Sequence, residues 1–368
     1  MKLIKTYKYK LQLTKKQDKT CNSWVDTCRY LYNLALSERI MVYEMRKKSV
    51  SKFDQYNQLP GLKKQFPWFA EVYSDTIQEV LDRLDKAYQN FFKGSGFPKF
   101  SKKGEYNSFT FKRNITVESE FIKLPKIGKV KYFNSRDIIG TPKTATIIKE
   151  NNDWFISITS EYETNVYEIV VDNSNAVGID VGIAVWATLS DGTTIKTPLF
   201  LENNLNKLKL LNKKISRQKR GSNERVKTIA KLQKLHKKIA NSRKDFLHKQ
   251  STIIANKYSA CYIEDLKLQK MNTVNSTLTR KMSDSGFGMF KVLLQYKFKE
   301  RGKHLGLVNP AYTSQTCSAC GTIDKKSRIS QSEFVCTSCG FIDNADLNGA
   351  KNIKSKGITQ EAKRKTLV

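Results

Sequence analysis

The stretch AVGIDVGIAVWATLS, residues 176–190, decides the class of fold because it places a single acid inside an apolar run. Its apolar character predicts a buried strand, in which Asp180 stands between Gly178 and Gly182. A carboxylate in such a strand is costly unless it is paired or binds a metal. The two glycines leave room for close approach by backbone or ligand. The stretch therefore predicts an α/β domain with Asp180 as a candidate functional residue.

Two other acids stand at the ends of predicted elements. Glu264 lies near the end of a second apolar strand, ACYIEDL at residues 260–266, where Asp265 is a rival. Asp346 precedes a predicted helix that begins near Leu347. The alternatives are an exposed acid at a strand end and a helix N-cap, a position that Asp favours. With Asp180, these acids supply the oxygen ligands that two-metal phosphodiester hydrolysis requires, and magnesium suits such ligands.

Four of the seven cysteines form two pairs, Cys317 with Cys320 and Cys336 with Cys339. Two residues separate the thiols within each pair, and a glycine follows each pair. Four thiolates at this spacing suit a tetrahedral zinc ion; an iron–sulfur site and unmetallated thiols are the alternatives. Because four thiolates leave no open position for a substrate, we expect a structural metal site. Asp343, which lies nearer the cysteines than Asp346, is assigned no chemical role.

The charge of the chain indicates a polyanionic partner. Lys and Arg total 66 against 34 Asp and Glu, which gives a net charge of +32. Residues 201–250 hold twelve lysines and four arginines against three acids, and helical spacing collects their apolar residues on one face. The opposite face is expected to contact phosphates; a merely solvated helical hairpin is the alternative. No segment is apolar for the roughly 18 residues of a membrane span, and the start lacks a secretory h-region.

The pattern of apolar residues divides the chain into segments. Short β-branched and aromatic runs predict a small antiparallel barrel or sandwich, helical spacing predicts an inserted helical domain, and alternating strands and helices follow. The predicted segments are residues 1–13 with 96–172 for the barrel, 14–95 for the helical insertion, 173–310 with 343–368 for the α/β domain, and 311–342 for the cysteines. Within the insertion, Asp75 and Gln78 have the spacing of a helical capping box.

A set of motifs in a fixed order resembles the TnpB family. The motifs are GIDVGIAVW, YIEDLKL, SDSGFGMF, YTSQTCSACG and CTSCGFIDNADLNGAKNI, supported by KTYKYKLQLTKKQ, GFPKF and NSRKDFLHK, so that the resemblance covers nearly the whole chain. Members of this family are transposon-encoded RNA-guided DNA nucleases, ancestral to the type V CRISPR effectors. The resemblance implies a multidomain fold: a RuvC-like nuclease domain of RNase H fold, an inserted zinc ribbon, a wedge β-barrel and an inserted helical recognition domain.

The resemblance also implies site residues and partners. The expected catalytic acids, which would hold two Mg²⁺ ions, are Asp180, Glu264 and Asp346, and one structural Zn²⁺ is expected at Cys317, Cys320, Cys336 and Cys339. Guide RNA and target DNA are the expected partners, with one protein chain per guide RNA. A short motif flanking the target is expected to be read by Gln78, with Lys112, Arg113 and Asn114 as further candidates. The implied location is the prokaryotic cytoplasm, in association with the nucleoid when DNA is bound.

Two positions depart from the family pattern. Phe287 stands where the family commonly has tryptophan, and Gly349 stands where it commonly has alanine. Neither is expected to touch the acids, so activity is expected. Two other functions remain as alternatives: a transposase of RNase H fold, and an RNA-guided DNA-binding regulator that does not cleave. The order Asp, Glu, Asp fits a RuvC-like site better than the Asp, Asp, Glu order of such transposases, and the intact set of acids argues against the regulator.

Overall fold

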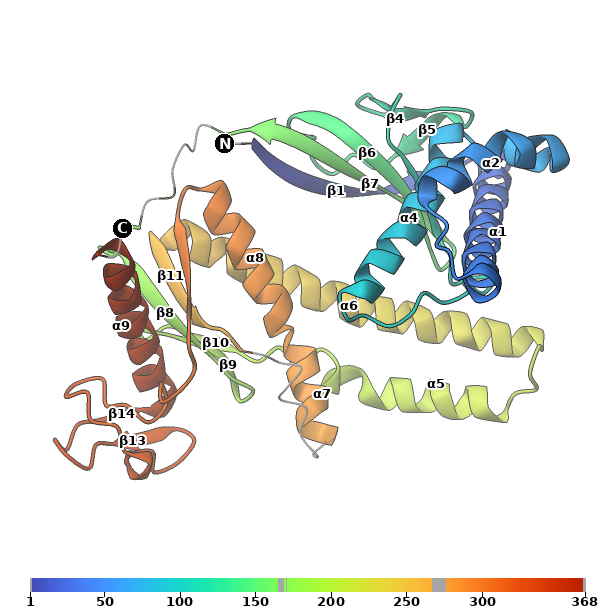
Figure 1. The fold of residues 1–368 in the computed structure, drawn as a ribbon. Coiled ribbons are helices and arrows are strands. Elements are labelled where there is room, and N and C mark those ends of the chain that lie inside the picture. Colours follow the sequence, from blue (N-terminus) through green and yellow to red (C-terminus); the bar gives the residue numbers. More distant parts are fainter. Residues whose placement is uncertain (1, 165–168, 170, 267–275, 367–368) are drawn as a thin grey trace. The chain divides into compact units, whose positions relative to one another are not determined.

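The computed structural model describes residues 2–164, 169, 171–266 and 276–366 (Figure 1). The predicted segments 1–13, 96–172, 173–310 and 343–368 run in part over residues outside these ranges. The chain divides into two compact units, here called the N-terminal unit, Lys2–Glu163, and the C-terminal unit, which begins at Thr164. Each unit has its own sheet and its own buried core.

The N-terminal unit is built on a seven-stranded antiparallel sheet in the order β2-β6-β7-β1-β5-β4-β3. Its strands are β1 Lys2–Gln12, β2 Ser108–Phe111, β3 Thr116–Val117, β4 Phe121–Leu124, β5 Gly128–Tyr132, β6 Thr141–Glu150 and β7 Asp153–Glu163. Alternate residues of β1, namely Tyr7, Tyr9 and Leu11, are buried because successive side chains of a strand point to opposite faces. Among the described residues no pairing joins β2 to β3, so the sheet does not confirm the predicted barrel.

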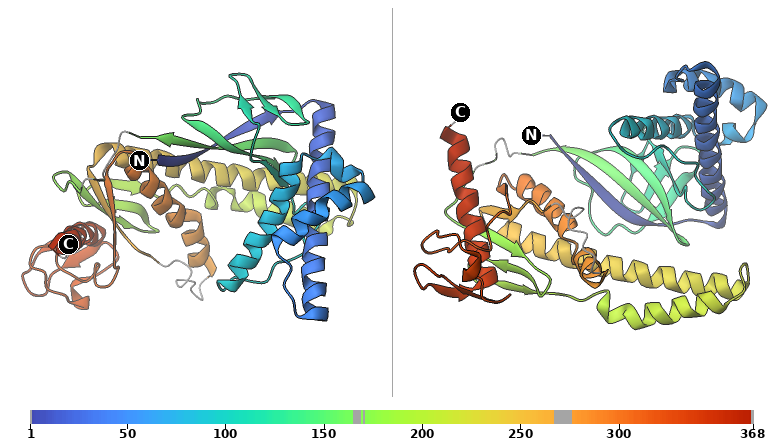
Figure 2. Two further views of the ribbon diagram at one scale, coloured as in Figure 1. Left: turned by 45° about the horizontal axis from the view of Figure 1, so that its top comes forward. Right: turned by 60° about the horizontal axis from the view of Figure 1, so that its bottom comes forward.

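Four helices lie between β1 and β2 in the chain: α1 Lys15–Arg46, α2 Lys52–Gln65, α3 Trp68–Glu71 and α4 Ser74–Phe92. Capping boxes begin the first two, with Thr14 and Gln17 for α1 and Ser51 and Asp54 for α2. The apolar stripe of α4 is buried with α1 and β2 in the core of this unit, which explains the helical spacing of the sequence. Figure 2 shows α1 and α4 against one end of the sheet.

The capping box predicted for α4 is wrong. The helix begins at Ser74 with Tyr73 as N-cap, and no side chain accepts a hydrogen bond there. The Asp75 carboxylate instead receives two hydrogen bonds from Arg113, at 2.8 and 2.9 Å. A bidentate guanidinium pair is stronger than a bond to a backbone amide, so a tertiary contact replaces the local one.

The C-terminal unit holds a five-stranded mixed sheet in the order β10-β9-β8-β11-β12. Its strands are β8 Ala176–Val181, β9 Val185–Leu189, β10 Thr194–Lys196, β11 Ala260–Glu264 and β12 His304–Val308. The stretch 176–190 is a hairpin of β8 and β9, so the predicted single strand is wrong. The chain turns at Gly182, whose N–H bonds Trp186 O at 3.1 Å; a Cβ there would lie 2.7 Å from Val185 O.

Helices cover both faces of this sheet. Alternation places Val177 and Ile179 of β8 on the face that packs against α6 Asn223–Lys257 and α8 Phe287–Glu300. The opposite face is covered by α9 Ala345–Thr366, whose Ile353 joins Ala176 in a smaller core (Figure 1). The remaining elements are α5 Leu205–Arg217, α7 Ser276–Ser285, β13 Glu333–Val335, β14 Ile342–Asn344 and two short 3₁₀ helices, Glu202–Asn204 and Lys325–Ser327.

None of the helices in the described part of the chain is both long enough and apolar enough to cross a membrane.

Helix α9 approaches the sheet at backbone distance because glycines line the contact. A Cβ on Gly178 would lie 2.2 Å from Ala350 O and 2.6 Å from Lys354 N, both in α9. The Tyr262 ring of β11 fills the space beside Gly357 of α9, where an added Cβ would lie 2.1 Å from the ring. No residue larger than glycine fits either position without moving the helix off the sheet.

We expect Gly178→Ala to destabilise the protein by about 2 kcal/mol or more, because overpacking against rigid backbone cannot be relieved by a side-chain rotation. Urea unfolding followed by circular dichroism measures the loss. Gly61→Ala is the matched control, since a Cβ there meets no atom within 4 Å. Equal stability of the Gly178 variant and wild type would contradict the packing described here.

Candidate metal centres

The register of the sheet brings Asp180 and Glu264 together. Strands β8 and β11 are parallel, with Gly178 opposite Tyr262 and Ile179 opposite Ile263. One further residue along this register sets Asp180 beside Glu264. Both side chains fall on the α9 face, because Gly178 and Tyr262, two residues earlier in each strand, face that helix.

Asp346 joins this pair from the first turn of α9. The three predicted acids line one pocket, and all three are half-buried. The rest of the pocket wall consists of Val181, Gly182, Ile183, Ala184, Val185, Pro310, Thr313, Ser314, Arg328 and Gln331. Acids from β8, β11 and α9, which are far apart in the sequence, therefore meet at one end of the sheet.

Burial and mutual repulsion disfavour the ionised form of these acids. Desolvation raises the pKa of Asp180 to about 7, and the charges of Glu264 and Asp346 add to the rise. Desolvation also raises the pKa of Glu264 and of Asp346, while the Arg328 guanidinium opposes the rise at Asp346. Three carboxylates that repel one another in a half-buried pocket form an environment in which a cation is favourable.

Two residues that the sequence did not single out contact the acids. Thr313 Oγ1 donates to Glu264 Oε1 at 2.5 Å, and Arg328 Nη2 lies 3.5 Å from Asp346 Oδ1. Thr313 lies just before the first cysteine pair and Arg328 lies between the two pairs. In the sequence, only their closeness to the cysteine pairs marked these two residues, and that closeness did not indicate a contact with the acids.

The rival acids have other partners. Asp343 pairs with Lys351 at 2.7 Å, and Asp265 pairs with Lys291 at 2.8 Å. Neither lines the acidic pocket. The alternative role for Asp346 as N-cap is wrong, because Asn344 Oδ1 accepts from the N–H groups of Asp346 and Leu347, at 3.0 and 3.1 Å. Capping by Asn344 leaves the Asp346 carboxylate to the pocket.

The expectation that both departures from the family pattern lie away from the acids is wrong for one of them. Phe287 is buried beside Trp186, with ring centroids 6.2 Å apart. Gly349, however, lies one turn after Asp346, and a Cβ there would be 2.8 Å from Asp180 Oδ2. Position 349 thus limits the space open to the Asp180 carboxylate, which spacing along the sequence could not reveal.

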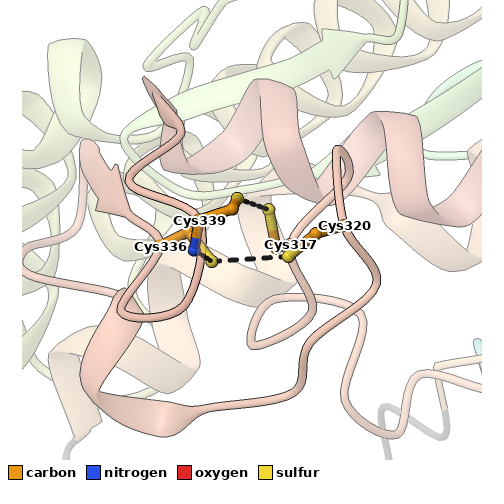
Figure 3. A group of neighbouring side chains, drawn as sticks. All are labelled: Cys317, Cys320, Cys336 and Cys339. Carbon is orange, nitrogen blue, oxygen red and sulfur yellow. Dashed lines mark hydrogen bonds between the residues drawn. The ribbon is translucent and has the colours of Figure 1, made fainter.

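The four predicted cysteines form a compact cluster (Figure 3). The Sγ atoms of Cys317 and Cys339 are 3.8 Å apart, and those of Cys320 and Cys336 are 3.6 Å apart. A tetrahedron with Zn–S bonds of about 2.3 Å has edges of about 3.8 Å. Among the described residues, these cysteines are the one group of three or more potential ligands whose atoms all lie within 4.8 Å of one another.

Each cysteine pair sits in the same kind of turn. Gly321 N–H bonds Cys317 O and Gly340 N–H bonds Cys336 O, at 2.9 and 3.0 Å. Both glycines have positive φ, 79° and 71°, which explains the glycine after each pair. Asn348 of α9 joins the first turn to the helix: its Oδ1 accepts from Ser318 N–H at 2.9 Å.

The four candidate nucleic-acid contacts lie together in the N-terminal unit. Gln78 is exposed on α4, one turn after Asp75. Arg113 pairs with Asp75, Lys112 pairs with Asp82 one turn further along α4, and Asn114 Nδ2 donates to Tyr73 at 2.9 Å. These ion pairs offset the charges of Lys112 and Arg113, whereas all four candidate side chains stay exposed.

Comparison with known proteins shows which families and solved structures this chain resembles. The model described as "Probable transposase" matches residues 144–275, "Cas12f1-like, TNB domain" matches 287–353, and "Helix-turn-helix domain" matches 1–48. The last of these segments is here a strand and one long helix, β1 and α1. A structure titled "Cryo-EM structure of the Cas12f1-sgRNA-target DNA complex" aligns over 96% of this chain and 99% of that chain, with a TM-score of 0.59 at 15% identity.

The chain thus has a Cas12f1-like fold. This fold carries the mixed sheet with its acidic pocket and the four-cysteine cluster ahead of the last helix. "Putative RNA-guided DNA endonuclease InsQ" of Escherichia coli (strain K12) is 35% identical over 97% of this chain and 93% of its own length. "TnpB-like protein L79" of Acanthamoeba polyphaga mimivirus is 24% identical over 98% of this chain and 75% of its own length. The chain belongs to the TnpB family, as its motifs predicted.

We expect Asp180→Asn to stabilise the metal-free protein, and increasingly so with rising pH. The raised pKa of Asp180 means that folding penalises the ionised acid; the penalty is absent below pH about 4 and grows up to about 7. The gain should be at least about 1 kcal/mol larger at pH 8 than at pH 5. Urea unfolding at both pH values, without added divalent cations, measures it. Asp343→Asn, the control, loses an ion pair and should gain no stability. A gain in stability of Asp180→Asn that does not change with pH would contradict the expectation.

Proposed function

We propose that the protein is an RNA-guided DNA endonuclease of a transposable element, which cleaves target DNA beside a short flanking motif by two-metal-ion hydrolysis. The observation that carries the proposal is the meeting of Asp180, Glu264 and Asp346 in one pocket, where each has a raised pKa. The name of the E. coli relative, an RNA-guided DNA endonuclease, supports the same activity.

The acidic pocket fits magnesium. Its donors are carboxylate oxygens, the ligands that Mg²⁺ prefers, and a divalent cation would favour their ionised form, which burial at all three acids and the neighbouring carboxylates at Asp180 disfavour. The three carboxylates line one pocket, in which the ions and their waters would be held. When bound, two Mg²⁺ ions would supply an activated water and stabilise the leaving oxygen of an in-line displacement.

The residues of the chain would then hold the metal ions and orient the substrate strand. Asp180, Glu264 and Asp346 bind the cations from three separate elements, and Thr313 fixes one oxygen of Glu264 through its hydroxyl. Arg328 brings a cation to the pocket beside Asp346, where a guanidinium suits a phosphate of the substrate strand. Gly349 keeps α9 from pressing on the Asp180 carboxylate.

The domain assignment belongs to the same proposal. We assign a RuvC-like nuclease domain of RNase H fold to residues 173–310 and 343–368, and a zinc ribbon to 311–342. A wedge β-barrel is assigned to residues 1–13 and 96–172, and a helical recognition domain to 14–95. Sulfur distances close to those of a tetrahedral zinc site support one structural Zn²⁺ at the cysteines.

The proposed partners are a guide RNA and a target DNA, with one protein chain for each guide RNA. Pairing with the guide would read the target, while the protein would neutralise phosphates and read the flanking motif. Gln78 is the proposed reader of that motif, because its exposed amide can pair with a base edge. Its neighbours Lys112, Arg113 and Asn114 would contact the nucleic acid beside that motif. The activity implies a cytoplasmic protein that associates with the nucleoid when bound to DNA.

Conservative replacement of each pocket acid should abolish guided cleavage, with a loss of about a hundred-fold or more for Asp180→Asn, Glu264→Gln or Asp346→Asn. The assay incubates protein, guide RNA, target DNA and magnesium, and quantifies cleaved DNA. Asp343→Asn and Asp265→Asn are the controls, since these acids lie outside the pocket and pair with lysines. Undiminished cleavage by the Asp180 variant, or loss with either control, would overturn the assignment.

Purified protein should contain about one zinc ion per chain, measured by elemental analysis. Cys320→Ser should lose most of this zinc and lower the melting temperature, because the metal binding energy is part of the folding energy. Cys28→Ala, a buried cysteine outside the cluster, should keep its zinc. Iron in place of zinc, or visible absorbance typical of an iron–sulfur centre, would exclude the zinc site.

The two alternatives give different products in the cleavage assay. A transposase would join DNA ends, so strand-transfer products would replace simple hydrolysis. A regulator would bind its target tightly without magnesium-dependent cutting. The intact acidic pocket favours hydrolysis over regulation.

A further inference from the structure

The last residue of α4 and the segment that follows it, before β2, expose aromatic rings. Residues 92–103 are called the aromatic platform below. The exposed fractions are 77% for Phe92, 45% for Phe97 and 53% for Phe100. Single exposed apolar side chains are common, but three exposed phenylalanines within nine residues of the chain are a concentration of apolar surface that favours a binding site.

The backbone of the aromatic platform is held in place. Phe97 packs edge-on against Tyr88 and Phe91, at centroid distances of 5.6 and 5.2 Å, and Pro98 is buried. Asn33 of α1 fixes the following turn, because its side chain donates to Ser101 O and accepts from Ser101 N–H, at 3.0 and 2.8 Å. The exposed rings are therefore presented by a fixed loop, so that little conformational entropy is lost when they bind a flat partner.

Lysines alternate with these rings. Lys93, Lys99, Lys102 and Lys103 are all exposed, and within the described part of the chain none of the four forms an ion pair. The single acid of residues 92–106, Glu105, uses its carboxylate to accept the backbone N–H of Lys102 at 2.9 Å. The aromatic platform thus combines exposed π faces with uncompensated positive charge.

We propose that the aromatic platform binds unpaired nucleotides, with Phe92 and Phe100 stacking on bases and the lysines contacting phosphates. Aromatic rings in a positively charged groove or surface are the combination by which proteins bind single strands without regard to sequence. The inference rests on the proposed function in taking nucleic acid as the partner, and adds a site for its single-stranded parts. A paired duplex hides its base faces, so the rings distinguish single strands from duplexes, whereas lysines alone do not.

The test uses full-length protein freed of RNA, with fluorescently labelled U12, dT12 and a 12-base-pair DNA duplex as probes in anisotropy titrations. Phe92→Ala/Phe100→Ala should weaken single-strand binding roughly five-fold or more for each lost stack, while duplex affinity stays unchanged. The dependence of affinity on salt should also stay unchanged, because no phosphate contact is lost. Lys99→Gln/Lys102→Gln/Lys103→Gln should instead flatten the salt dependence for all three probes.

Phe53→Ala/Phe133→Ala is the matched control, since these rings are 64% and 51% exposed elsewhere in the same unit. It should bind all probes as wild type does. Phe92→Tyr/Phe100→Tyr keeps the rings and should retain single-strand affinity, which separates stacking from a folding defect. A larger effect on U12 assigns the site to guide RNA, and a larger effect on dT12 assigns it to the DNA strand.

Wild-type affinity of the alanine variant for both single strands would overturn the inference, as would an equal loss for the duplex. A lowered melting temperature with unchanged binding would show that the rings pack against protein, and would overturn it too. The guided-cleavage assay with wild-type protein decides the proposed function separately, because oligonucleotide binding requires neither a guide nor an active pocket.

Discussion

The contact between α9 and β8 is the constraint on which the C-terminal unit depends. Gly178 has no side chain, so the backbone of α9 at Ala350 and Lys354 lies directly on the strand. This approach carries Asp346, one turn earlier in the helix than Ala350, to the end of the sheet where Asp180 and Glu264 lie. A larger residue at 178 would push the helix outward and separate the acids. The packing of α9 on the sheet and the meeting of the three acids therefore both depend on the absence of a side chain at Gly178.

Ionisation of the three acids in the pocket is electrostatically unfavourable. Burial raises the pKa of each acid, and at Asp180 the neighbouring carboxylates add to the effect. Arg328 offsets part of this cost at Asp346 without filling the pocket. Such a site lowers the stability of the fold, as expected if its proposed role is to bind cations. The rest of the unit supplies that stability through two apolar cores, one on each face of the sheet.

Hydrogen bonds join the cysteine cluster to the N-terminal part of α9. Asn348 bonds the turn of the first cysteine pair, and its Nδ2 also donates to Thr316 O at 2.8 Å. Arg328 and Thr313, which touch the acids, lie in the same segment as the cysteines. A metal that fixes the four thiolates would therefore also fix the groups around the pocket. The two neighbouring aspartates differ in their surroundings: Asp343 pairs with Lys351, whereas Asp346 lines the acidic pocket.

The sequence by itself determined the elements, the family and the candidate ligands, because these depend on local periodicity and on motif spacing. It identified a helical insertion, the two cysteine pairs with their glycines, and the three acids as a set. It could not determine the hairpin at Gly182, the replacement of a capping box by the Asp75–Arg113 pair, or the closeness of Gly349 to Asp180. Only the tertiary structure decided these, because the Asp75–Arg113 and Gly349–Asp180 contacts join residues far apart in the chain, and the apolar run 176–190 suits one long strand as well as two short ones. Steric fit and pairing of charges across elements, and not local preference, fix such contacts.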